Sequence, residues 1–315
     1  MYRGILMRLS QAVPVLLIFT VMVFLLMHML PGDPALAIAG PDATEEAVEK
    51  IREQLGLNRP LIVQLLEWFA HLAVGNFGES LMLKQSVVSA VVERLPVTMS
   101  LSLISLIVTL PIGIGLGVVA AYWRNSWIDA FVMVIALLGV SLPGFWVGIL
   151  SVMYFSVSLG WFPPSGYVPL SEGGLWAWFA ALIQPAIVLA LFQIGFLARI
   201  TRSAMLDVLD QDFIRTARAK GVDEWTTVAK HAFRNTLIPV VTVLGITLSL
   251  LVGGSVVIEQ VFALPGIGRL IVQGILNRDY PLVQGTMLLF GFAFVLINIL
   301  VDIIYTFVDP RVRYG

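Results

Sequence analysis

The sequence predicts an all-α integral membrane protein with about six transmembrane helices. Of its 315 residues, 58% are hydrophobic and only 12% are charged, and the mean hydropathy is +0.93. Soluble domains carry about 25% charged residues, so a water-soluble fold of this length would lack the polar surface needed to cover itself. The apolar residues also gather into runs of about 20 residues, the length that crosses a hydrocarbon core as a helix.

Six apolar runs are predicted to span the membrane as helices, because lipid offers no partner for an open backbone. They cover residues 10–30, 97–122, 130–158, 176–198, 237–258 and 285–308. Pro143 and Gly144 are expected to break the third run. The first run has an alternative interpretation as a signal peptide cleaved near Ala35-Leu36-Ala37. Its apolar stretch is longer than the usual 7–15 residues or so of a signal peptide, which favours a retained span.

The distribution of Lys and Arg predicts that both chain ends lie in the cytoplasm. Short cytoplasmic segments carry more Lys and Arg than short external loops do. With the N-terminus inside, twelve such residues lie inside: Arg3, Arg8, Arg124, the seven between Arg199 and Arg234, Arg311 and Arg313. Only Arg269 and Arg278 then lie in a short external loop.

The predicted spans divide the chain into two parts. Residues 1–95 comprise the first span and an extracytoplasmic segment, in which 42–59 and 62–69 are expected to be amphipathic helices. Residues 96–308 form the transmembrane core, with a cytoplasmic loop over 199–236. Residues 309–315 are a cytoplasmic tail.

Several kinds of chemistry are missing from this chain. There is no cysteine, and the three histidines lie far apart, so no metal site is expected. No Gly precedes a Lys, so no P-loop for ATP is present. The only acid within a predicted span that could couple transport to an ion gradient is Asp302, about two turns from the cytoplasmic end. No nucleophile with a base, as an intramembrane hydrolase needs, is apparent. No catalytic residue is therefore expected.

The basic loop over 199–236 is predicted to form a helix, a turn and a second helix. Asp212 is expected to cap the first helix, and Gly221 suits its left-handed C-terminal residue. Asp223 opens the second helix, whose buried face is expected to hold Trp225, Val228, Ala229, Ala232 and Phe233. An interfacial helix on anionic lipid is one interpretation of the loop. A docking site for a cytoplasmic protein fits better, because it also explains the glycine turn and the small residues Ala217 and Ala219. No nucleic-acid partner is expected.

The loop residues also carry a family resemblance. Phe213 to Gly221, followed by Lys230 to Asn235 and Pro239, resembles the EAA loop of binding-protein-dependent ABC importers, in particular the B-type permease of the dipeptide/oligopeptide subfamily. Arg215-Thr216 stands where the broader consensus has Glu-Ala, and this departure also resembles the subfamily. Further motifs resemble it in the same order: Met29 to Pro34, Leu55 to Pro60, Asn76 to Ser80, Pro96 to Thr98, Glu259 to Arg269, Arg278 to Pro281 and Asp309 to Arg313.

The resemblance implies a type I importer permease in a bacterial inner membrane. Its partners would be a sister permease, two ATPase subunits that bind ATP and Mg²⁺, and an extracytoplasmic solute-binding protein, with no cofactor on this chain. The implied cargo is di- or oligopeptides, with glutathione or nickel as alternatives within the family. A self-sufficient secondary transporter is the alternative from another class.

The resemblance also implies two sets of site residues. The first is a coupling helix, 212–221, that contacts an ATPase subunit through Phe213, Arg215, Ala217, Arg218, Lys220 and Gly221. The second faces the binding protein from the external loop 259–280 and comprises Pro265, Gly266, Gly268, Asp279 and Tyr280. Gly266-Ile267-Gly268 is expected to form a tight turn in that loop.

Overall fold

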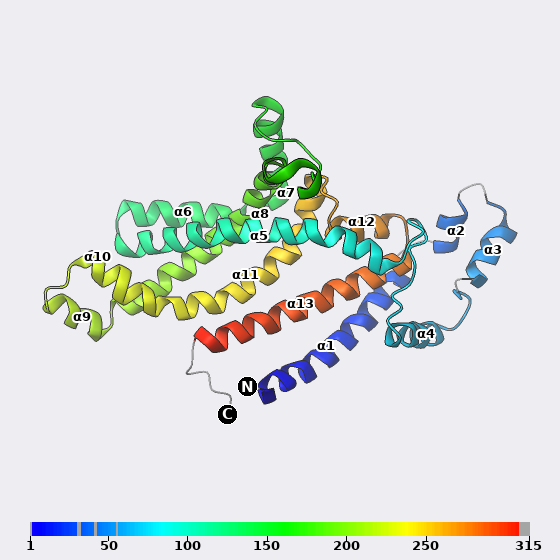
Figure 1. The fold of residues 1–315 in the computed structure, drawn as a ribbon, viewed down its shortest axis with the longest axis horizontal. Coiled ribbons are helices and arrows are strands. Elements are labelled where there is room, and N and C mark those ends of the chain that lie inside the picture. Colours follow the sequence, from blue (N-terminus) through cyan, green and yellow to red (C-terminus); the bar gives the residue numbers. More distant parts are fainter. Residues whose placement is uncertain (1, 30–32, 41–42, 55, 309–315) are drawn as a thin grey trace. The chain divides into compact units, whose positions relative to one another are not determined.

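A computed structural model describes residues 2–29, 33–40, 43–54 and 56–308 of the chain (Figure 1). Within these residues the fold is all-α, as predicted, with one isolated antiparallel bridge between Glu79 and Ser86. The tail 309–315, its motif from Asp309 to Arg313, and the Leu30–Gly32 part of the first motif lie outside the described residues, as does the side chain of Asp302.

The helices follow one another with short connections. In chain order they are α1 (Tyr2–Met29), α2 (Pro34–Ala39), α3 (Glu45–Gln54), α4 (Leu61–Ala73), α5 (Val87–Tyr122), α6 (Trp127–Ser141), α7 (Gly144–Ser151), η1 (Val152–Ser158), α8 (Leu170–Leu209), α9 (Asp212–Ala219), α10 (Glu224–Thr226), η2 (Thr227–Ala232), α11 (Phe233–Val261), α12 (Ile267–Leu276) and α13 (Tyr280–Val308). The elements η1 and η2 are π-helical.

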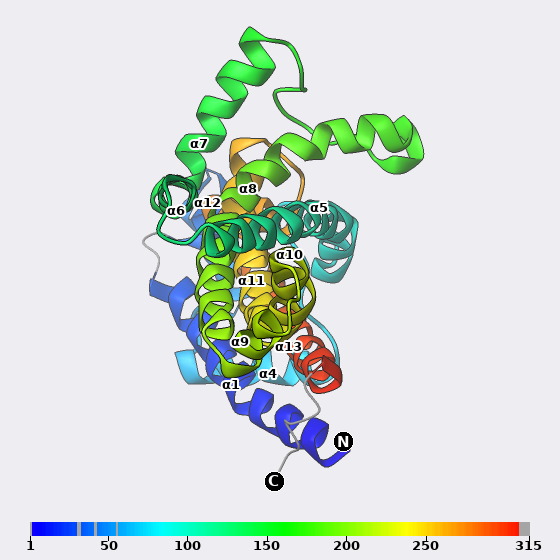
Figure 2. The same ribbon diagram turned by 90° about the vertical axis from the view of Figure 1, so that its left-hand side faces the viewer.

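The predicted spans are helical in the structure, and the third one is divided between α6 and the pair α7–η1. Among the described residues, α1, α5, α8 and α13 are long and apolar enough to cross a membrane, and the bent pair of α6 with α7–η1 qualifies as a fifth span. The pair bends by 98° at Leu142 and Pro143, as the sequence predicts, and α7 turns away from α6 (Figure 2). Helix α11 covers the remaining run. The two amphipathic helices predicted over 42–59 and 62–69 correspond to α3 and α4.

The described chain forms two compact units. Unit 1 comprises residues 1–96 and 265–296, and unit 2 comprises 97–264 and 297–315. Residues 265–296, which the sequence analysis assigns to the core 96–308, pack in the structure with the N-terminal residues of unit 1. Helices α5 and α13 contribute to both units.

Helix α5 has the inside-out pattern of a protein that faces lipid. Its buried positions include the polar residues Thr98, Ser105 and Thr109, which are at most 4% exposed. On its outer surface, Leu103 and Ile107 are 56% and 60% exposed. Water would drive such residues into a core, whereas hydrocarbon is as apolar as they are. This burial pattern agrees with the predicted membrane class.

Close helix packing in unit 2 depends on glycine. A Cβ on Gly117 would lie 2.6 Å from the carbonyl oxygen of Ala198, and one on Gly195 would lie 2.3 Å from that of Ala136. Small residues let the backbones of α5, α6 and α8 approach this closely. These glycines therefore serve helix packing.

An ion pair fixes the start of α6 to α8. Arg202 donates from Nε and Nη2 to the two carboxylate oxygens of Asp129, at 2.5 and 2.6 Å, and the Asn125 N–H donates to Asp129 at 3.0 Å. The carboxylate is nearly buried, with 7% of its side chain exposed. Bidentate pairs of this kind combine strength with a defined geometry.

We expect Asp129→Ala to destabilise the protein by about 3 kcal/mol, because Arg202 would lose its only close carboxylate in a mostly buried site. The matched control is Arg124→Ala, which removes the exposed pair with Asp210 and should cost less than about 1 kcal/mol. Thermal unfolding of the purified chain in detergent measures both changes. Equal losses in the two variants would contradict the role of the buried pair.

Candidate functional site

The turn between α8 and α11 is shorter than the predicted loop 199–236. Residues up to Leu209 continue α8, and α11 begins at Phe233, so the segment between the two long helices is 210–232. We call this segment the 210–232 turn. It lies at one end of the α8–α11 pair and holds α9, α10 and η2 (Figure 1).

Helix α9 ends in a glycine turn, as predicted. Gly221 has a φ of +78°, its N–H donates to the Arg218 carbonyl at 3.0 Å, and the Val222 N–H donates to the Ala217 carbonyl at 3.2 Å. These two bonds form a Schellman motif, which satisfies the last carbonyls of the helix. A side chain at this φ would be strained, so the glycine is required by the turn.

The predicted cap at the other end of α9 is wrong. Gln211 occupies the N-cap position, and Asp212 is the first helical residue, 95% exposed in its side chain. Arg215 Nη1 donates to Asp212 at 3.3 Å, a contact between exposed groups. Asp212 therefore stabilises the N-terminus of α9 only through the interaction of its negative charge with the helix dipole.

Ile214 anchors α9 to unit 2. Its side chain is fully buried in a cluster with Ala121, Met205, Val208, Leu209, Val228 and Ala232. Ala217, one turn later, is half-buried on the same side, so it lies partly against the protein and not on the outer surface. Phe213 is 41% exposed, a large aromatic side chain on the outside of a polar helix. The structure thus places Phe213 where a partner could reach it.

Some charged residues of the 210–232 turn bond to other groups of the same turn. Arg218 donates two hydrogen bonds to Glu224, at 3.0 and 2.6 Å, and this pairing raises the pKa of Arg218. Asp223 caps α10 by accepting from the Thr226 N–H at 2.9 Å, as predicted, and that bond lowers the pKa of Asp223. Lys220 is exposed and makes no ion pair with the described residues. Of the predicted cations, Lys220 is therefore the freest to meet an acidic partner.

The buried face predicted for the second helix is only half right. Val228 and Ala232 are buried, but Trp225 is 68% exposed and Ala229 is exposed too. The reason is η2, whose i to i+5 hydrogen bonds widen the turn and shift the face that points inward. Trp225 and Ala229 instead line an apolar groove with residues of α5, including Leu110, Tyr122 and Trp123.

Most of the segment 265–280 of unit 1 is helix α12, Ile267–Leu276, and not the expected loop with a tight turn at Gly266-Ile267-Gly268. Gly266 precedes α12 with an extended φ of −96°, and Gly268 lies inside that helix. Both glycines are buried, whereas Pro265 is exposed. The chain reverses just before, at Ala263, whose φ is +52°. Gly266 and Gly268 therefore belong to the packing of unit 1.

Asp279 is buried in unit 1, with 1% of its surface exposed. Ser80 Oγ donates to it at 2.6 Å, the Met82 N–H at 3.1 Å and the Leu282 N–H at 3.1 Å. The last of these is an N-cap contact for α13. Two motifs that are 199 residues apart in sequence thus meet at one carboxylate. Tyr280, the next residue, is half-buried and lines a cavity described below.

The arrangement is that of a membrane protein with a polar turn at one end of a helix pair. Several helices are long and apolar enough to cross a membrane, and the anchored 210–232 turn joins one of them, α8, to α11. Residues 1–102 match the N-terminal membrane component of binding-protein-dependent transport systems, and residues 113–314 match the inner membrane component. The chain therefore belongs to the family of binding-protein-dependent transport system inner membrane components, the permeases of ABC importers.

Known proteins match this sequence along nearly the whole chain. It is 60% identical over 310 residues to a peptide transport system permease protein of Brucella abortus (strain 2308), with 98% of both chains covered. It is 43% identical over 314 residues to the glutathione transport system permease protein GsiC of Salmonella typhimurium (strain LT2), with 100% of both covered.

The fold also resembles solved structures. A chain of the inward-facing MetNI methionine ABC transporter (selenomethionine soak, CY5 crystal form) aligns with a TM-score of 0.59 at 22% identity. The alignment covers 70% of this chain and 96% of that one. This likeness supports the predicted type I importer permease fold.

We expect Asp279→Ala to destabilise unit 1 by about 3 kcal/mol, because one buried Ser hydroxyl and two backbone N–H groups would lose their acceptor. Ser80→Ala should cost about 1–2 kcal/mol. Asp212→Ala, at the exposed start of α9, is the control and should change stability by about 0.5 kcal/mol or less. Hydrogen exchange at the first turn of α13 measures the effect, and unchanged protection in Asp279→Ala would contradict it.

Proposed function

We propose that this chain is the permease subunit of an ATP-driven importer of short peptides. It would form the translocation path with a sister permease, receive cargo from an extracytoplasmic solute-binding protein, and take its energy from two ATPase subunits. The observation that supports an external energy source is the 210–232 turn, which presents an exposed aromatic residue and an exposed cation on an anchored helix. The absence of a P-loop from the sequence supports the same conclusion.

The turn would transmit force because it is rigid at both ends. Ile214 fixes α9 to the ends of α5 and α8, and the Schellman motif at Gly221 fixes the direction in which the chain returns. A partner that grips Phe213 and Lys220 would therefore displace α8 and α11 together with α9. Closure of the ATPase subunits on ATP would supply that displacement and switch the side from which the path is open.

The orientation proposed for the chain follows from its cations. The N-terminus and the 210–232 turn lie in the cytoplasm, and α2 to α4 with α12 lie outside. This places the ATPase contact and the binding-protein contact on opposite sides of the membrane. Pro265 and Tyr280, the more exposed of the second set of predicted residues, remain candidates for the contact with the binding protein.

Peptides are favoured as cargo by the relative at 60% identity, which is named as a peptide permease. Glutathione is the second candidate, favoured by the relative at 43% identity. Reconstituted into vesicles with its partners, the complex should show ATP hydrolysis stimulated by dialanine more than by glutathione. Stimulation by glutathione alone would exclude short peptides as its cargo.

The coupling role is tested by changing the outer surface of α9. Phe213→Asp should abolish peptide uptake by the reconstituted complex, because it places a charge on the outer surface of α9, where close apolar contact is needed. Phe213→Leu, the matched control, keeps an apolar side chain and should retain most uptake. Wild-type uptake by Phe213→Asp would refute docking at α9.

The glycine turn is tested separately. Gly221→Pro should uncouple uptake from ATP hydrolysis, because proline cannot adopt a φ of +78° and has no N–H to donate to Arg218. Gly221→Ala meets open space and carries only the left-handed strain of about 1–2 kcal/mol, so its loss should be partial. Equal activity of the two variants would show that the turn geometry does not matter for coupling.

A further inference from the structure

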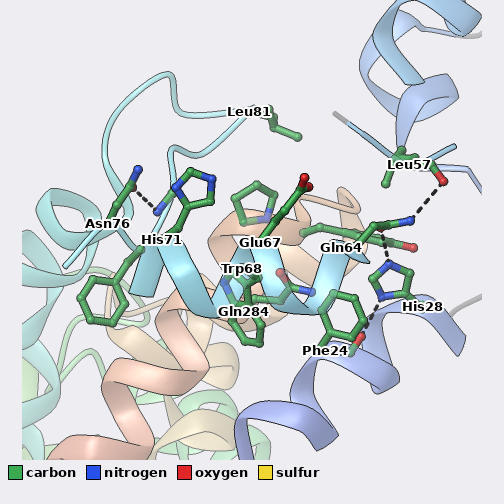
Figure 3. A pocket seen from close by; sticks show the side chains of 14 residues that line it. Phe24, His28, Leu57, Gln64, Glu67, Trp68, His71, Asn76, Leu81 and Gln284 are labelled. Carbon is green, nitrogen blue, oxygen red and sulfur yellow. Dashed lines mark hydrogen bonds between the residues drawn. The ribbon is translucent and has the colours of Figure 1, made fainter. Parts of the chain in front are cut away.

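Unit 1 contains a cavity of about 290 Å³ that the proposed coupling role does not use (Figure 3). Its lining comes from the end of α1, from α4, from the segment between α4 and α5, and from the start of α13. The side chains that matter for its chemistry are Phe24, His28, Gln64, Trp68, Tyr280 and Gln284.

One wall of the cavity is held in place by its own hydrogen bonds. The Gln64 amide nitrogen donates to the carbonyl oxygens of Leu57 and Arg59, at 3.2 and 2.8 Å. Its oxygen consequently faces His28 Nε2 at 3.1 Å, and His28 Nδ1 contacts the Phe24 carbonyl at 2.8 Å (Figure 3). Gln64 and His28 are therefore engaged within the protein and give the site a fixed shape.

Gln284 behaves differently. Only 7% of its surface is exposed, it lines the cavity, and its carboxamide makes no hydrogen bond to any described residue. Its carboxamide therefore opens into the cavity, where water or a ligand can bond to it. A carboxamide offers an acceptor and a donor side by side, the arrangement that a peptide group complements with its own N–H and C=O.

Aromatic side chains form part of the remaining lining. The Trp68 ring stacks on Phe24 with centroids 5.9 Å apart, and Tyr280 meets His28 edge to face at 5.6 Å. Polar side chains, among them His71 and Asn76, also line the cavity, and sites for small organic ligands combine aromatic surface with such polar groups. The volume corresponds to about ten water molecules at roughly 30 Å³ each, which suits a ligand of dipeptide size. The one carboxylate in the lining, Glu67, is paired with Arg59, so the walls favour a ligand group without net charge.

We propose that this cavity binds a short peptide through its peptide bond, with Gln284 as the hydrogen-bonding partner and Trp68 as the stacking surface. It would be a cargo subsite on the permease itself, separate from the binding protein and from the 210–232 turn. The choice of ligand rests on the proposed peptide cargo.

The test is photo-labelling of the complete complex in lipid nanodiscs with alanyl-photoleucine, a dipeptide that carries a diazirine. The adduct should map to the segments that contain Trp68 and Gln284. Gln284→Leu keeps the volume but removes the amide, and it should lower labelling about fivefold or more. Gln85→Leu, the same change in unit 1 outside the cavity, should leave labelling unchanged. Excess dialanine should compete, whereas alanine, which has no peptide bond, should not.

Trp68→Phe guards against misfolding as the cause of a loss, because it retains an aromatic ring for stacking while it removes the second ring and the N–H of the indole. It should weaken labelling less than Gln284→Leu does, at an unchanged melting temperature. Labelling of Gln284→Leu at the wild-type level would overturn the proposal, as would an adduct confined to other segments. A crosslink between the cavity residues and the binding protein, formed with or without dipeptide, would also overturn the proposal, because the binding protein would then occupy the cavity. Peptide uptake that continues without labelling of the cavity would reject this subsite and leave the proposed function standing; loss of peptide-stimulated ATP hydrolysis in the wild type would reject the function itself.

Discussion

Helix ends are the most demanding positions in this molecule. A helix leaves up to four N–H groups unpaired where it begins, and hydrocarbon offers them no partner. Several side chains meet this need directly, among them Asp33 at α2, Ser126 at α6, Asp223 at α10 and Asp279 at α13. With only 12% of its residues charged, the chain places several of its carboxylates at such junctions. Polar side chains thus close the first turns of the apolar helices α6 and α13.

The same constraint explains why the 210–232 turn is stiff. Between α8 and α11 the chain must reverse direction, and it does so through α9, which ends in a Schellman motif, and through α10, which Asp223 caps. Nearby, Arg202 ties α8 to Asp129 at the start of α6. If α9 contacts a partner as proposed, these contacts would pass a force on α9 directly to α8 and its neighbours.

The sequence was sufficient for features that depend on local rules. The apolar runs predicted the spans, Pro143 predicted the break before α7, and Gly221 predicted the left-handed turn. It was insufficient at η2, where the backbone hydrogen bonds follow the π-helical pattern and not the α-helical one. It was also insufficient at α12, where a helix forms in place of the predicted loop. Helix α2 was missed although Asp33-Pro34, a capping residue followed by proline, is a recognisable start signal. The burial of Asp279 depends on Ser80, 199 residues away, and no local pattern reports such a pairing.

Several residues of the motifs that reveal the family hold separate segments of the chain together through side-chain contacts. Asp33 pairs with Arg52, Ser80 with Asp279, and Thr98 donates to the fully buried Glu259 at 2.7 Å. Each pair joins distant parts within one unit. Such residues identify the architecture, and other residues of the same motifs, among them Leu57, Asn76 and Tyr280, line the cavity of unit 1. Under the proposed cargo subsite, discrimination between cargoes would also depend on Gln284, which no motif marks. Membership of the permease family thus fixes how the chain folds more firmly than it fixes what the chain carries.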